Sequence, residues 1–168
     1  QIYNVYNSIT NKDLQIFRDI KNIYCLNLYN CNNITDVNVL SNCYKLILDK
    51  CNKITDVSAL SNCYDLALFH CDNITDFSAL SNCHNLALFY CENITDVSVL
   101  SNCYNLALYH CENIIDISAL GNCNTLSLCN CENITNISAL GNCKNLELIE
   151  LDISDVSALG SCKELILY

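Results

Sequence analysis

Residues 71–90 read CDNITDFSALSNCHNLALFY, and residues 91–110 read CENITDVSVLSNCYNLALYH. The same pattern returns in steps of twenty from Cys31 to Glu150, with mostly conservative replacements. A fixed period of this size is the sequence signature of a solenoid, in which each unit packs only against its neighbours. The chain is therefore predicted to be one elongated repeat array.

The apolar positions of one unit predict its local structure. Leu66 and Leu68 alternate with Ala67 and Phe69, so this segment is expected to be a short strand with its leucines directed inward. Behind Asp76 the apolar residues recur three apart, which is typical of one short turn with an aspartate N-cap. Because twenty residues cannot also hold a long helix, the outer side is predicted to consist of 3₁₀ turns and extended chain.

These residues carry a resemblance to a known family. The segment CYDLALFHCDNI, residues 63–74, resembles the strand segment of a leucine-rich repeat, with cysteine replacing the opening leucine and the asparagine after the strand. The following ITDFSAL, residues 74–80, resembles the short back of internalin-like repeats, and the string ITDVSALSNC is similar to arrays encoded by giant DNA viruses and some protists. The resemblance covers about residues 23–168. It implies an α/β-type leucine-rich-repeat solenoid of short parallel strands, in a family that serves mainly as a scaffold for binding.

The first 24 residues differ from the repeats and are predicted to form an N-terminal cap. Thr10 and Asp13 resemble a capping box, and a helix is expected over about residues 11–20 because the apolar residues have helical spacing: Leu14, Phe17 and Ile20. This segment is interpreted as a degenerate first repeat. Residues 25–168 would then form the solenoid, with about seven rungs and an uncapped C-terminal strand through which self-association is expected.

Composition narrows the classes of partner. The net charge is −10, and the chain has a single arginine, Arg18. A basic face able to release counterions from nucleic acid cannot be assembled, so nucleic acid is not an expected partner. No apolar run approaches 18 residues, so a membrane is not expected either. Because the chain has no methionine, even at position 1, it is expected to be a fragment or a processed product.

Most of the fifteen cysteines fall into two columns set by the repeat. One column follows the strands and the other precedes them: Cys31, Cys51, Cys71, Cys91, Cys111 and Cys131, then Cys43, Cys63, Cys83, Cys103, Cys123, Cys143 and Cys162. The spacings alternate between 12 and 8 and include no CxxC motif, so neither a structural metal nor another cofactor is expected.

The redox state of these columns leaves two alternatives. Neighbouring rungs lie about 4.8 Å apart, so disulfides between them are geometrically feasible. However, each cysteine has a like neighbour on both sides, and pairing would break the regular repeat. Reduced thiols that pack as small hydrophobic groups are favoured. They place the protein in a reducing intracellular compartment, which would be the host cytoplasm or the virion if a virus encodes it.

Three further columns are polar. The motif N-x-S/T occurs at Asn33, Asn73, Asn93, Asn133 and Asn136. These asparagines are glycan acceptors in a secreted protein, or corner residues that bond backbone groups of the next rung, the interpretation favoured here. The periodic aspartates are interpreted as caps of the turns: Asp36, Asp56, Asp76, Asp96 and Asp116. A second acidic column is interpreted first as a solvated edge and second as a docking strip for a basic partner: Asp72, Glu92, Glu112 and Glu132.

No catalytic site is predicted. Each histidine adjoins a cysteine in sequence, but neighbours along a strand point to opposite faces. The preferred candidate site is instead the strand face turned away from the core, which is concave in leucine-rich repeats. It is expected to carry small and aromatic side chains: Ala67, Ala87 and Ala107, then Phe69, Phe89 and Tyr109, then His70, Tyr90 and His110.

Two functions remain open at this stage. Exposed aromatic strips tend to be contact surfaces, so the first is a non-enzymatic module that binds a protein partner through this face. The competing interpretation of the strip is a ladder retained only because it favours strands. The second function is a structural or assembly protein, for example a virus particle or surface component, that packs through its ends and faces. The tyrosines at the corner before the strands are expected to be structural: Tyr24, Tyr44, Tyr64 and Tyr104.

Overall fold

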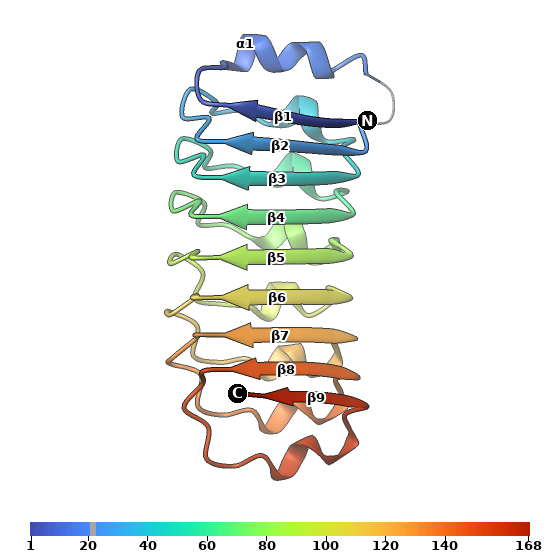
Figure 1. The fold of residues 1–168 in the computed structure, drawn as a ribbon, viewed down its shortest axis with the longest axis vertical. Coiled ribbons are helices and arrows are strands. Elements are labelled where there is room, and N and C mark those ends of the chain that lie inside the picture. Colours follow the sequence, from blue (N-terminus) through green and yellow to red (C-terminus); the bar gives the residue numbers. More distant parts are fainter. Residues whose placement is uncertain (21–22) are drawn as a thin grey trace.

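The computed structural model of the chain describes residues 1–20 and 23–168. Within these residues the chain forms one sheet of nine parallel strands in sequence order, with each strand on a successive turn of a solenoid (Figure 1). The strands are β1 (Ile2–Tyr6), β2 (Cys25–Tyr29), β3 (Lys45–Asp49), β4 (Asp65–Phe69), β5 (Asn85–Phe89), β6 (Asn105–Tyr109), β7 (Thr125–Cys129), β8 (Asn145–Ile149) and β9 (Glu164–Leu167).

The register of the sheet follows the repeat period. Equivalent residues pair from strand to strand, as Leu66 does with Leu86 and Ala67 with Ala87. The two leucines of each repeat strand are directed inward, and Leu66 and Leu68 have no exposed surface. They form one continuous core with the isoleucines, the cysteine columns and the leucines of the outer turns. The predicted leucine-rich-repeat solenoid is confirmed.

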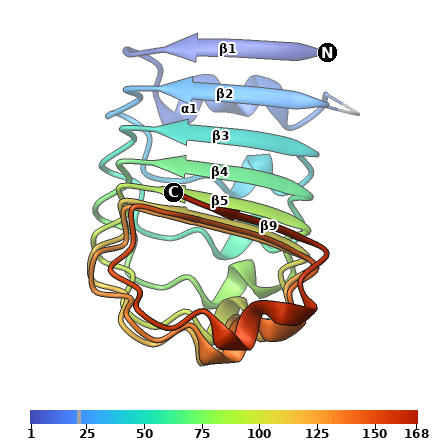
Figure 2. The ribbon, with the colours of Figure 1, turned by 60° about the horizontal axis from the view of Figure 1, so that its bottom comes forward.

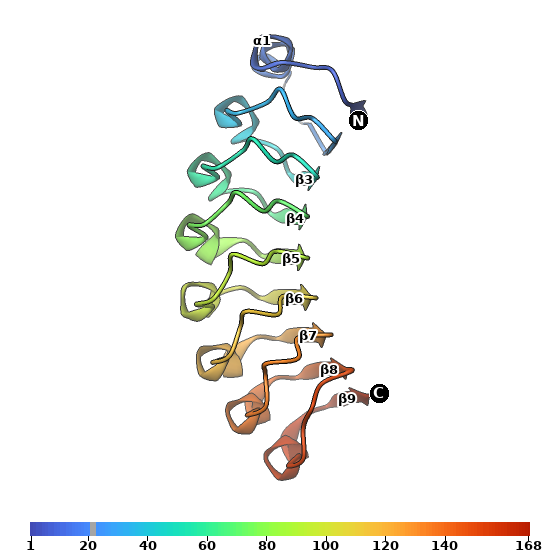
Figure 3. The same ribbon diagram turned by 90° about the vertical axis from the view of Figure 1, so that its left-hand side faces the viewer.

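The outer side consists of 3₁₀ turns joined by extended chain, as predicted. Figure 2 shows these turns opposite the sheet, and Figure 3 shows that the molecule curves with the sheet on its inner, concave side. After the first rung the turns cover Asn38–Leu40, Ser58–Leu60, Ser78–Asn82, Ser98–Leu100, Ser118–Asn122, Ser138–Asn142 and Ser157–Ser161.

The aspartates do accept backbone hydrogen bonds at these turns, but from one position earlier than predicted. The Ser78 N–H donates to the Asp76 carboxylate at 2.9 Å, while the N-cap position of the turn is Phe77. Asn136 takes the same role in its own rung, where the Ser138 N–H donates to its side-chain oxygen at 3.0 Å. An uncharged acceptor is therefore compatible with the turn.

The N-terminal segment differs from its prediction in extent. Helix α1 covers only Asn11–Leu14 and continues as a 3₁₀ turn over Gln15–Phe17, whereas a helix over 11–20 was expected. The capping contact is present, because the Thr10 N–H donates to the Asp13 carboxylate at 2.8 Å. A short turn fits here because the segment occupies the same place in its rung as the 3₁₀ turns of the repeats. Residues 21 and 22 lie outside the described residues.

The number of rungs was expected to be about seven. Residues 25–168 contain eight strands and seven 3₁₀ turns, because a strand both begins and ends this part of the chain. The strand β1 adds a ninth by pairing with β2. The division into a cap and a solenoid stays a prediction.

The asparagine corners bond the preceding rung and not the next one. The Asn113 side chain donates to the Glu92 carbonyl at 2.8 Å, and that of Asn133 donates to the Glu112 carbonyl at 2.7 Å. The expected direction of these hydrogen bonds was wrong, because each asparagine side chain lies next to the corresponding loop of the preceding rung.

The cysteine columns also connect each rung to the one before it. The Cys71 thiol donates to the Leu48 carbonyl at 3.5 Å, and the Cys103 thiol to the Leu80 carbonyl at 3.6 Å. All fifteen cysteines are free thiols in this structure, and only Cys129 and Cys162 are not fully buried. Burial raises the pKa of Cys71 to about 12, so the column thiols are unreactive packing groups at neutral pH.

Candidate functional site on the concave face

The concave face is made by the strand residues that alternate with the buried leucines. Because the strands are in register, Ala67, Ala87 and Ala107 form one row across β4, β5 and β6. The next outward position forms a parallel row of Phe69, Phe89 and Tyr109, which we call the aromatic ladder. The structure thus brings these six predicted site residues together on one surface.

The rings of the aromatic ladder are stacked. The ring centroids of Phe69 and Phe89 are 4.2 Å apart with an interplanar angle of 7°, and those of Phe89 and Tyr109 are 4.6 Å apart at 9°. The rings contact one another through their faces, and all three side chains are half-buried. The ladder therefore presents a row of ring edges, which carry the positive end of the aromatic quadrupole.

A second stacked row lies just beyond the strand ends. Tyr90 stacks between His70 and His110, with both centroid distances equal to 4.4 Å. These three residues have φ between 49° and 56°, a left-handed conformation that is uncommon outside glycine. The conformation lets the chain turn while the His70 N–H still donates to the Phe89 carbonyl at 3.0 Å. A tyrosine ring separates the two histidines, and no group of three metal-ligating side chains occurs among the described residues.

A shallow groove follows the alanine row. Its volume is about 170 Å³, and Ala87 and Ala107 form its floor. Opposite the aromatic ladder, the Asn105 amide donates to the Asn85 side-chain oxygen at 2.8 Å. The Asn105 side-chain oxygen is itself buried and has no partner among the described residues. The groove therefore has alanines as its floor and side-chain amides along one side, and the aromatic ladder lies on the other side of the alanine row.

Polar contacts close the two ends of this groove. At one end, the Lys45 ammonium pairs with the Asp65 carboxylate at 2.7 Å. At the other, the Ser127 hydroxyl donates to the Glu147 carboxylate, so the Tyr109 hydroxyl, 2.9 Å away, donates to Ser127. These contacts order side chains of adjacent rungs before any ligand binds. The sequence did not single them out, because they depend on the pairing of rungs with unlike residues.

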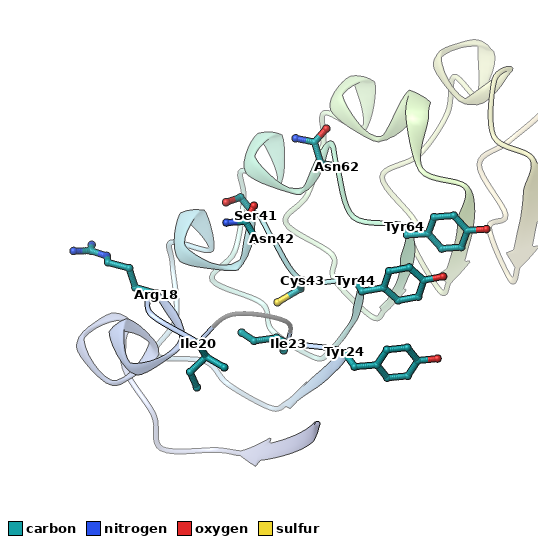
Figure 4. A pocket seen from close by; sticks show the side chains of 10 residues that line it. All are labelled: Arg18, Ile20, Ile23, Tyr24, Ser41, Asn42, Cys43, Tyr44, Asn62 and Tyr64. Carbon is teal, nitrogen blue, oxygen red and sulfur yellow. The ribbon is translucent and has the colours of Figure 1, made fainter.

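A third stacked row lies at the corner before the strands. His84 completes it, since its ring stacks on Tyr64 at 4.5 Å and on Tyr104 at 4.6 Å. Residue type alone indicated only the tyrosines as members of this row, although His84 occupies the same place after a column cysteine. The position of His84 in the repeat, rather than its residue type, was therefore the signal that it belongs to this stacked row. Its first members, Tyr24, Tyr44 and Tyr64, line a larger groove of about 780 Å³ near the N-terminal end (Figure 4).

Comparison with known proteins identifies the fold. No protein-family model matches the chain, and no curated protein matches it in sequence. The structure is similar to an internalin (inlF) from Listeria monocytogenes str. 4b F2365, with a TM-score of 0.62 and 22% identity, over 86% of this chain and 53% of that one. It is also similar to internalin C2 (inlC2) of the same strain, with a TM-score of 0.50 and 21% identity, over 96% of this chain and 68% of that one.

These similarities concern the fold alone, and the chain spans about half the length of the first internalin. The predicted likeness to viral and protist arrays stays a prediction. Among the described residues, no helix is long and apolar enough to cross a membrane. The strand register, the 3₁₀ back and the similar structures agree that the chain folds as a leucine-rich-repeat solenoid of the kind seen in internalins.

Proposed function

We propose that the chain is a non-enzymatic module that binds a protein partner through its concave face. The observation that supports it best is a stacked aromatic ladder on one side of the alanine row, with a shallow groove along the Asn85–Asn105 amide row on the other side. Aromatic residues with little rotational freedom dominate the energetics of many protein interfaces. Here the stacking fixes their rings before binding, so little side-chain entropy remains to be lost.

The small floor residues support the same proposal. A larger side chain at Ala87 or Ala107 would fill the groove, whereas alanine lets a partner approach the sheet. A ladder that served only to favour strand formation does not require a groove beside it.

The test is a capture experiment with three purified proteins. The parent, a variant with Phe69, Phe89 and Tyr109 changed to serine, and a control with Tyr24, Tyr44 and Tyr64 changed to serine are each fixed to beads. Each variant replaces three stacked rings, so losses of stacking are comparable. Circular dichroism and thermal melts establish that both variants fold.

We expect a partner that the parent and the Tyr24 control retain and that the ladder variant loses. If all three proteins capture the same set, the aromatic ladder is architectural and the proposal fails. If the Tyr24 control alone loses the partner, recognition occurs at the corner row instead.

A second candidate function, assembly through ends and faces, rests on the strand β9. Its side chains Leu165, Ile166 and Leu167 are 40–44% exposed, and an open sheet edge of this kind pairs readily with another strand. That strand can come from a second copy of the chain or from residues beyond Tyr168. Sedimentation as a monomer over a wide concentration range would count against the assembly function.

A further inference from the structure

We infer that the partner presents an extended cationic segment, rich in lysine or arginine, along the edge of the concave face where the aromatic rows meet an acidic row. This inference rests on the proposed function and names the chemistry of the partner. The acidic row has four members, one on each of four consecutive rungs: Asp72, Glu92, Glu112 and Glu132.

The acidic row lies immediately beside the aromatic rows. Tyr90 and Glu92 are separated by one residue, Cys91, which is buried. Two residues span at most about 7 Å along the chain, so the backbone of the acidic row lies within that distance of the backbone of the ring row. Both rows lie in the loops after the strand ends, which line one edge of the sheet in Figure 1. Glu92 is exposed and the Tyr90 ring is 40% exposed, so both are accessible to a partner.

The negative charge along this edge has no counterpart within the repeats. Residues 54–143 contain no lysine or arginine, although they contain nine of the eighteen acidic residues. Among the described residues, the only ion pair joins Lys45 and Asp65, at the groove end nearer the N-terminus. The carboxylates of the acidic row repeat at about 4.8 Å, the spacing of the strands, so they repel one another. A cationic segment would offset this repulsion.

A row of aromatic rings beside a row of carboxylates fits long basic side chains. Lysine and arginine place their apolar stems along hydrophobic surface while the charged group stays in water or on an anion. Stems lying over His70, Tyr90 and His110 would reach the carboxylates of the next row. A second copy of this chain is disfavoured as the occupant, because it carries the same acidic row and a net charge of −10.

The test measures binding of a labelled twelve-residue peptide of alternating arginine and valine by fluorescence anisotropy. Two variants carry the same change of net charge. One replaces Glu92, Glu112 and Glu132 with glutamine. The other replaces the aspartates of the outer turns, Asp76, Asp96 and Asp116, with asparagine, which Asn136 shows to be compatible with the turn.

We expect the glutamine variant to bind the peptide about tenfold more weakly, as three exposed ion pairs of ordinary strength imply. The asparagine variant should differ from the parent by less than threefold, and rising salt should weaken the parent more than the glutamine variant. If both variants weaken equally, or if a glutamate–valine peptide binds as well, the inference is wrong.

The same variants separate this inference from the proposed function. A captured protein that depends on the aromatic ladder but is indifferent to the glutamine changes would refute the cationic segment and leave the concave face as a binding site. A captured protein indifferent to both sets of changes would refute both.

Discussion

The buried cysteine columns predict that the protein unfolds in mildly alkaline solution. Burial raises the pKa of seven column thiols from 9.0 to about 12: Cys43, Cys63, Cys71, Cys83, Cys103, Cys111 and Cys123. These side chains are at most 2% exposed. Since the folded value is raised, their contribution to stability is fully present below pH 9 and is lost as the pH rises toward 12.

The magnitude follows from proton linkage. Each thiol that ionises only in the unfolded state lowers the free energy of unfolding by about 1.4 kcal/mol per pH unit. Because each thiol is half ionised in the unfolded state at pH 9, seven of them together remove about 7 kcal/mol between pH 9 and 10, which is comparable with the whole stability of an ordinary domain. We therefore expect the unfolding midpoint to lie at about pH 10.

The assay is urea unfolding followed by circular dichroism in excess reductant, repeated from pH 8 to pH 9.5. At pH 9.5, a variant with Cys83, Cys103 and Cys123 changed to alanine should show a slope of unfolding free energy against pH that is smaller by about 3 kcal/mol per unit. Tyrosine ionisation is common to both proteins and cancels in the comparison. If the two slopes agree, or if the parent stays folded at pH 11, the columns are not buried reduced thiols.

Three other predictions test local features by urea unfolding. Hydrogen bonds from the side chain and backbone of Ser78 lower the pKa of Asp76. The contribution of Asp76 to stability is therefore present above pH 3.8 and lost on acidification. The variant Asp76→Asn should lose less stability between pH 7 and pH 3 than the parent. Lys50 has φ 53°, and asparagine adopts this left-handed conformation more readily than lysine, so Lys50→Asn should raise the free energy of unfolding by about 1 kcal/mol. The control Lys53→Asn loses the same charge and should change stability little. A Cβ at Gly121 would lie 2.2 Å from a backbone carbonyl oxygen of the next rung, so Gly121→Ala should cost about 1–3 kcal/mol, while Gly160→Ala, with nothing within 4 Å, should be tolerated. An equal effect of the two lysine changes, or of the two glycine changes, would contradict the local geometry described here.

The fold was predictable because the same pattern of apolar and polar residues recurs in nearly every repeat. Alternation around Leu66 and Leu68 determines which side of each strand is buried, and the period of twenty determines the register. The terminal segment was less predictable. Leu14, Phe17 and Ile20 have helical spacing, yet spacing of three and four residues does not distinguish an α-helix from a short helix that continues as a 3₁₀ turn.

The candidate site was predictable in its residues but not in its geometry. The alternation placed Phe89 and Ala87 on the concave face, whereas the left-handed backbone at Tyr90 was signalled only indirectly, by asparagine at the equivalent positions 30 and 130. Such a conformation is normally signalled by glycine or asparagine. Here it is maintained by a hydrogen bond from the Tyr90 N–H to the Tyr109 carbonyl, 2.9 Å long, on the next strand. Only the assembled sheet supplies that acceptor.

The most direct test of concave-face recognition is site-specific photo-crosslinking to the captured partner. A benzophenone amino acid replaces Tyr90, at the edge after the strands, or Tyr104, at the edge before them, which are 40% and 46% exposed. The two edges are roughly 20 Å apart across a five-residue strand. Recognition by the concave face and its acidic edge predicts a crosslink from position 90 and little from position 104. A crosslink from position 104 alone would place the partner on the corner row and contradict the account.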